Sequence, residues 1–331
     1  MRSKKYLITL LKAAVAVLLV WYLLKSGRLS KESVERLFNP GAFPFLLLGA
    51  FAFLLSQALA SLRIVFLLRI IGIRLGLFQA FKLTMVGNFF NMVIPGMVGG
   101  DIVKGYYLVK SEEKQKGRSS GIVVVDRVLG LLALLMIGAA SVVYLLEKGS
   151  SFLAAYKHEM RILVVISALV TFSFTAFIFL GKDARVREKI KGMAYRFLKQ
   201  GFLYNIVEGF GAVTKRRRYP VYAFVLSLVI QMISLAGILV LINIHLDKAL
   251  DVVPLMAVSS LVMLLGVIPV TPGNIGWTEL LATYGWSAVG SNNGAEIFFY
   301  WRVVTLLCSL PGGFFYFFPP RNPDVEKSAQ I

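Results

Sequence analysis

The chain has 331 residues, of which 57% are hydrophobic, and its mean hydropathy of +0.74 excludes a soluble globular domain of this size. The formal net charge is +19, but the basic residues cluster between apolar runs, which favours contact with anionic lipid over nucleic acid. A single cysteine excludes an intrachain disulfide, and two widely separated histidines do not predict a metal site, so we expect no cofactor.

The first apolar run, residues 6–24, follows a short basic stretch as a signal peptide does. Its apolar region is too long for a signal peptide and no A-x-A site follows it, so we expect an uncleaved anchor helix. Several later runs exceed the roughly 18 residues that a membrane-crossing helix needs. The sequence therefore predicts an all-α polytopic membrane protein with about six full spans, at 6–24, 42–68, 121–146, 161–180, 220–244 and 296–318.

Two further apolar segments, 76–94 and 252–270, lead into stretches that interrupt a helix, "VIPGMVGGD" and "VIPVTPGNIGWTE". Proline ends a helix by removing a hydrogen-bond donor, and glycine allows the backbone to turn and to be approached closely. Short segments at 102–109 and 279–289 follow the breaks. We expect two re-entrant hairpins, each entering and leaving on one side of the membrane. Their turn residues are Pro95, Gly96, Gly99, Gly100, Pro272, Gly273 and Gly276.

The distribution of basic residues predicts the orientation of the chain. With the N-terminus inside, 24 lysines and arginines fall in the internal segments 1–5, 63–75, 101–120, 181–219 and 319–331, and 7 fall in the external ones. This asymmetry favours both termini inside. The expected location is therefore the cell inner (cytoplasmic) membrane, with both termini cytoplasmic. Segment 181–219 is expected to form a helix held on anionic lipid headgroups or, equally well, a solvated basic loop.

The chain is expected to form a single membrane domain, 1–331, built from two similar halves, 42–146 and 220–318. Each half contains a span, a broken hairpin and a second span. The predicted topology places the first hairpin inside and the second outside, so the halves form an inverted repeat, as in many secondary transporters. The remaining parts are an anchor helix with an outer loop (1–41), a connecting span with the basic segment (147–219) and a cytoplasmic tail (319–331).

Each half carries an acid after its break and an arginine in the next span, Asp101 with Arg127 and Glu279 with Arg302. A charge at the bilayer centre costs roughly 2.5–3.5 kcal/mol on insertion scales, so these residues are candidates for substrate binding. The planar guanidinium suits a phosphate, and a carboxylate suits an ammonium headgroup or the arginines themselves. Capping of helix N-termini is an equally good explanation of the two acids.

Other polar residues have weaker claims on the site. Asp126 and Arg127 either contribute to it or, equally well, pair with other buried groups only to hold helices together. Asn88 and Asn91, one turn apart, are expected to satisfy backbone groups of the broken helix, with ligand contact as the lesser alternative. Three more residues are expected to form interhelical hydrogen bonds or to lie at the membrane interface, namely Gln57, Arg63 and Gln231.

Four motifs, "NMVIPGMVGGDIVKGYYL", "VVVDRVLGLLAL", "IPVTPGNIGWTE" and "YWRVV", occur in this order over most of the chain. Together they resemble the integral-membrane family named after lysylphosphatidylglycerol synthase, also described as flippase-like. Lys104, a further candidate substrate-binding residue, stands where the family often has arginine, which keeps the charge but loses the two-pronged fork. Asn274 stands where the family often has glycine, and this difference bears on the turn.

The resemblance implies a membrane domain that moves a lipid across the bilayer. We expect no aminoacyl-transferase domain of the kind found in the full-length synthases, since only a short tail follows the last span. The expected function is therefore flipping of a phospholipid or polyprenyl-linked lipid through a polar site between the hairpins, without enzymatic activity. The alternatives are a non-transporting accessory subunit of envelope lipid or glycan synthesis, or an intramembrane lipid-phosphate transferase. A homo-oligomer or an envelope-synthesis enzyme as partner also stays open.

Overall fold

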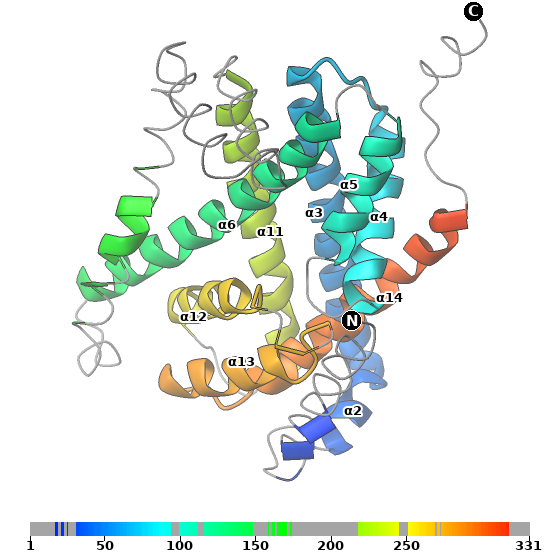
Figure 1. The fold of residues 1–331 in the computed structure, drawn as a ribbon. Helices are drawn as coiled ribbons and strands as arrows, with labels where there is room; N and C mark the ends of the chain where they lie inside the picture. Colours follow the sequence, from blue (N-terminus) through cyan, green and yellow to red (C-terminus); the bar gives the residue numbers. More distant parts are fainter. Residues whose placement is uncertain are drawn as a thin grey trace, which may run out of the picture.

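The structure, a computed structural model, describes residues 31–93, 99–111, 116–147, 218–244, 251–268, 270–271 and 273–317, with some further positions between 17 and 25 and between 158 and 173. Throughout these residues the regular secondary structure is helical, without a strand, which confirms the all-α prediction (Figure 1). Outside the described residues lie most of the expected span 6–24, half of the expected span 161–180, nearly all of the basic segment 181–219, and the tail 319–331.

Four helical stretches among the described residues are long and apolar enough to cross a membrane, and they match four of the expected spans. Their bounds are Pro40–Ile70, Ser119–Glu147, Tyr219–Ile244 and Gly294–Phe317. The corresponding elements are the 3-10 turn η1 (Pro40–Ala42) with α3 (Phe43–Ile70), α6 (Lys116–Glu147), α11 (Arg218–Val240) with η4 (Leu241–Ile244), and α14 (Gly294–Phe317). A short helix, α2 (Lys31–Leu37), precedes them.

The two expected hairpins are helix–break–helix units. The first consists of α4 (Leu77–Val93) and α5 (Gly99–Ser111), and the second of α12 (Val252–Leu265) and α13 (Trp277–Ala288). The two helices of each unit pack against each other, as their neighbouring ribbons in Figure 1 show. Each second helix begins two or three residues earlier than the sequence suggested, because the last glycines of the break already belong to the helix or cap it.

The packing of the helices is that of a two-fold repeat. Within each half the first helix packs on the last, α3 on α6 and α11 on α14, and the hairpin packs between them. Between the halves, α4 packs on α14, α12 packs on α6, and α3 packs on α11. The helices correspond in pairs, α3 with α11, α4 with α12, α5 with α13 and α6 with α14. Swapping the members of every pair gives the same set of contacts. The pattern supports the repeat that the sequence predicts.

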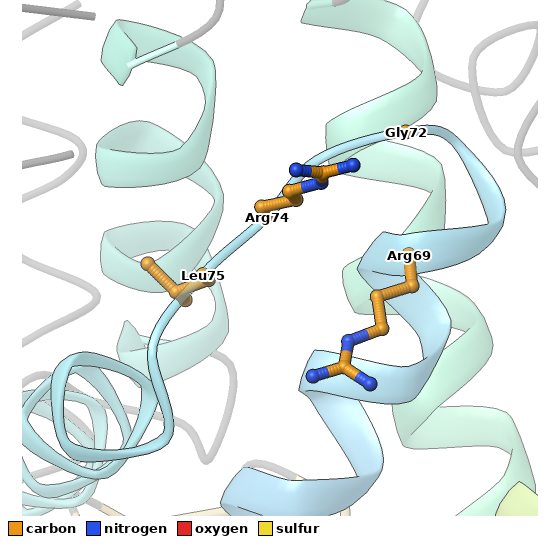
Figure 2. A pocket seen from close by; sticks show the side chains of 4 residues that line it. All are labelled: Arg69, Gly72, Arg74 and Leu75. Atoms are coloured by element: carbon orange, nitrogen blue, oxygen red, sulfur yellow. The ribbon is translucent and has the colours of Figure 1, made fainter. Parts of the chain in front are cut away.

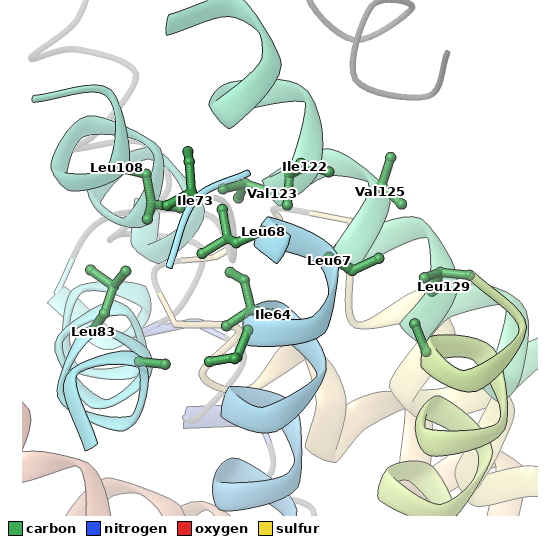
Figure 3. Packing of buried hydrophobic residues seen from close by; sticks show 13 residues of the cluster. Ile64, Leu67, Leu68, Ile73, Leu83, Leu108, Ile122, Val123, Val125 and Leu129 are labelled. Atoms are coloured by element: carbon green, nitrogen blue, oxygen red, sulfur yellow. The ribbon is translucent and has the colours of Figure 1, made fainter. Parts of the chain in front are cut away.

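Each half has its own apolar core. In the first half, buried residues of α3, α4, α5 and α6 meet around Leu68 and Leu83 (Figure 3). In the second half, buried residues of α11 to α14 gather around Trp286 and Tyr300, both fully buried. Large apolar side chains on the outside of α3 and α11, such as Phe51 and Val225, are more than half exposed, as expected for helices that face lipid.

Candidate functional site

The turn of the second hairpin lies against the end of the first. A Cβ atom built on Gly273 would stand 3.3 Å from the carbonyl oxygen of Met92, in the last turn of α4. Gly273, Asn274 and Gly276 have positive φ values of 56°, 57° and 78°, so this turn requires residues that tolerate the left-handed region. The break between α12 and α13 is therefore closely packed at the point where the two hairpins meet.

Arg302, in α14, holds this turn in place. Its Nη1 donates to the carbonyl of Gly273 at 2.6 Å, and its Nη2 donates to the carbonyl of Asn274 at 2.8 Å and to Thr278 Oγ1 at 2.6 Å. The same guanidinium forms a two-pronged ion pair with Glu279, with Nε on Oε1 and Nη2 at 3.1 Å from Oε2. The side chains of Arg302 and Glu279 are 21% and 4% exposed. Most of the donor capacity of Arg302 is thus used inside the protein.

Asn274 adopts the positive φ angle of the turn and also forms hydrogen bonds there. Its side-chain amide donates to the carbonyl of Gly266, the residue that ends α12, and its backbone carbonyl receives Arg302. Compared with a glycine, which has no side chain, Asn274 therefore adds a hydrogen bond that joins the turn to the end of α12. The Oδ1 atom of Asn274 is buried and receives no hydrogen bond from the described residues.

In the first hairpin Asp101 and Arg127 form the corresponding pair, in a more open setting. Arg127 Nε lies 3.4 Å from Asp101 Oδ2, and the two side chains are 35% and 18% exposed. Asp101 lies in the first turn of α5 and Glu279 in the first turn of α13, so both also complement the helix dipole. The structure joins both acids to the arginine of the following span.

The remaining part of the first break is closed by Asn91 and two glycines. Asn91 Oδ1 accepts the backbone N–H of Gly100 at 2.7 Å, which satisfies one of the free donors at the start of α5, as expected for this residue. A Cβ on Gly100 would stand 2.0 Å from the carbonyl oxygen of Gly87, so α4 and α5 touch backbone to backbone here. Lys104 lies over the same Gly87 from the next turn of α5. Gly99 begins α5, while Pro95, Gly96 and Pro272 lie outside the described residues.

Asp126 points to a different partner from its neighbour Arg127. It accepts Arg63 Nε at 2.7 Å, and Arg63 Nη1 donates to Ser227 Oγ at 2.7 Å. Arg63 is 6% exposed and Asp126 is 9% exposed. This buried cluster joins α3, α6 and α11, which agrees with the alternative that Asp126 holds helices together.

Two more predicted polar residues connect helices in the same way. Asn88 donates to Gln57 Oε1 at 2.9 Å, so it bridges α4 and α3. The break whose backbone it is expected to satisfy, residues 94–98, lies outside the described residues. Gln231, on α11, donates to the carbonyl of Gly130 on α6 at 3.1 Å. The expectation of interhelical hydrogen bonds for Gln57, Arg63 and Gln231 is confirmed.

The two ion pairs belong to one connected region. Arg302 binds the turn at Gly273, Gly273 lies on Met92, and the adjacent Asn91 binds the start of α5, which carries Asp101 and its partner Arg127. Sequence reasoning missed Thr278 and Asn274 as acceptors for Arg302, although an asparagine after Pro-Gly is a turn signal. No group of three or more histidines, cysteines and acids that could hold a metal ion occurs among the described residues.

Comparison with known proteins gives three results. The family model described as the lysylphosphatidylglycerol synthase TM region matches residues 9–312. A UPF0104 membrane protein of Methanocaldococcus jannaschii is 27% identical over 250 residues, which cover 71% of this chain and 72% of that protein. No solved structure matches the chain at a significant level.

Proposed function

Because the chain belongs to the lysylphosphatidylglycerol synthase transmembrane-region family, we propose that it moves a phospholipid or lipid-linked substrate across the cytoplasmic membrane. The single observation that carries this proposal is the connected polar region at the meeting point of the two hairpins, with one charged pair from each half. Broken helices inside a membrane protein are tolerated where they are buried in protein or line a water-filled cavity, and charged side chains there are functional-site candidates. We propose no chemical step.

In the proposed topology both hairpins are re-entrant, both termini are cytoplasmic and the two halves are inverted. The exchange pattern of the helix contacts supports a two-fold repeat. Where such halves are inverted, the substrate site lies where their broken helices meet. Movement of one hairpin against the last helix of the other half would then expose the polar region first to one side and then to the other.

We assign the two arginines different roles. Arg127, whose side chain is 35% exposed, is the phosphate contact, and Asp101 balances its charge when no lipid is present. Arg302 is a positioning residue, because its hydrogen bonds go to the hairpin turn and to the buried Glu279. The candidate site is thus asymmetric in its chemistry although it is symmetric in its fold.

The test is leaflet exchange in liposomes that contain the purified protein. Labelled phosphatidylglycerol, lysyl-phosphatidylglycerol and a polyprenyl-phosphate sugar are compared for the wild type, Arg127→Gln and the exposed control Arg161→Gln. We expect exchange of at least one lipid, a fall of about tenfold or more in Arg127→Gln and no change in the control. Absence of exchange for every lipid would refute transport by this chain alone and favour the accessory role. Equal exchange in Arg127→Gln would refute the assigned contact.

A further inference from the structure

The turn between α3 and α4 carries a pocket that is separate from the hairpin region. Arg69, Gly72, Arg74 and Leu75 line a cavity of about 520 Å³. Figure 2 shows the chain arching from Arg69, near the end of α3, over Gly72 to Arg74 and Leu75. Two guanidinium groups therefore flank one hollow, and both residues are exposed. The volume lies in the range of small-ligand sites.

The turn that carries the pocket is held by backbone hydrogen bonds. The N–H of Gly72 donates to the carbonyl of Arg69 at 3.2 Å, and the N–H of Ile73 donates to the carbonyl of Leu68 at 3.1 Å. Together with the positive φ of 85° at Gly72, these bonds form a Schellman motif. Ile73 and Leu68 are 2% and 0% exposed and belong to the apolar core of the first half. The two arginines on either side of Ile73 are thus held at the surface by a buried anchor.

Within the part of the chain that the structure describes, no acid pairs with the two arginines of the pocket. Neither Arg69 nor Arg74 forms an ion pair or hydrogen bond through its guanidinium with any residue that the structure describes, and Arg69 has only a ring contact, 6.0 Å from the centroid of Phe66. The pocket also lies at the end of the candidate span Pro40–Ile70, the depth at which lipid headgroups lie. Two arginines on a hydrogen-bonded turn at this depth are a suitable arrangement for a phosphate group.

We propose that this pocket binds the phosphate group of an anionic phospholipid, at a site distinct from the hairpins. A phosphodiester between the two guanidinium groups would receive charge-assisted hydrogen bonds from both sides, while Leu75 contacts the apolar part of the lipid. Free inorganic phosphate shares this chemistry but lacks the acyl chains, so the two sources are separable by experiment. The site does not depend on transport at the hairpins.

The experiment uses the full chain in neutral detergent and follows the thermal unfolding midpoint during titration with dioctanoyl phosphatidylglycerol, dioctanoyl phosphatidylcholine or inorganic phosphate. The variants are Arg69→Gln/Arg74→Gln, Arg69→Lys/Arg74→Lys and the charge-matched control Lys25→Gln/Arg161→Gln. We expect saturable stabilisation by phosphatidylglycerol in the wild type and the control. The glutamine variant should bind about tenfold more weakly or worse, since it loses charge-assisted bonds from two side chains.

Stabilisation by inorganic phosphate that the glutamine variant abolishes would support the phosphate site and identify a soluble ligand as its source. Weakened binding in the lysine variant would support the two-pronged geometry. Equal phosphatidylglycerol binding in the wild type and the glutamine variant would overturn the proposal. Full binding in the lysine variant would overturn the two-pronged contact. An equal loss in the control would overturn the proposal, because diffuse charge would then account for the effect. All these variants alter exposed side chains, so a fold defect is not expected.

Discussion

Arg302 and Arg127 occupy corresponding positions in the two halves, and the structure predicts unequal losses of stability when each is replaced by glutamine. Arg302→Gln leaves Glu279, with a side chain only 4% exposed, without its counter-charge. It also frees the carbonyls of Gly273 and Asn274. Removing one partner of a buried pair destabilises a protein by about 3–5 kcal/mol, and we expect a loss in this range.

Arg127→Gln removes a looser interaction. The Arg127–Asp101 distance is 3.4 Å and the arginine side chain is 35% exposed, so solvent screens the pair. Exposed pairs contribute about 0–1 kcal/mol, and we expect a change no larger than this in the free energy of unfolding. Combined with the transport proposal, Arg127→Gln should fold and fail to move lipid, whereas Arg302→Gln should fold poorly.

The assay is unfolding of the purified protein in mixed micelles with increasing sodium dodecyl sulfate, followed by tryptophan fluorescence. A double-mutant cycle isolates the buried pair. Arg302→Gln/Glu279→Gln leaves no unpaired charge, so we expect a coupling free energy of at least about 1 kcal/mol between the two positions. Equal stability of Arg302→Gln and Arg127→Gln, or additive effects in the cycle, would show that Arg302 does not support the turn as described.

Substitutions at Asn274, Gly312 and Arg63, with matched controls, test the packing by the same unfolding measurement. Asn274→Ala should destabilise the chain by about 2 kcal/mol, because it loses the bond to Gly266 and strains the backbone at φ 57°. Asn274→Gly loses only the bond, so we expect about half that loss. Equal losses in the two variants would show that backbone strain does not contribute. Gly312→Ala should destabilise it, since the new Cβ would stand 2.1 Å from the carbonyl oxygen of Met85, whereas Gly105→Ala has open space and should be neutral or slightly stabilising. Arg63→Gln should destabilise by about 3–5 kcal/mol because Asp126 keeps a buried charge, and Arg63→Gln/Asp126→Asn should recover part of this loss; no recovery would refute the pairing.

The two helix breaks could be predicted from the sequence because they depend on residues at the break itself. Proline and glycine act on their own backbone and on the turn before it, so "IPGMVGGD" and "TPGNIGWTE" predict a helix break without reference to the tertiary structure. The long apolar runs likewise predict α3, α6, α11 and α14, since length and apolar composition alone decide whether a helix can span a membrane.

The partners of the charged residues could not be predicted in the same way. Asp126 and Arg127 are adjacent in sequence, yet one faces Arg63 on α3 and the other faces Asp101 on α5, because successive side chains of a helix point in different directions. Which neighbour each one meets depends on how the helices are arranged, and no local pattern contains that information. The unequal exposure of the two arginine–acid pairs depends on the same tertiary packing.

The packing of α4 on α14 has a consequence for how the protein is made. The backbone of Met85 packs directly against Gly312, and the ring of Phe89 lies 3.0 Å from where a Cβ of Gly313 would be. The first hairpin therefore packs on α14, the last described helix of the chain. The ribosome synthesises α4 long before α14, so the face of the first hairpin that packs on α14 has no partner helix until α14 has been made. The fold is therefore completed only after the second half has been inserted, and a chain released early, before α14, would leave that face for chaperones and membrane proteases to recognise.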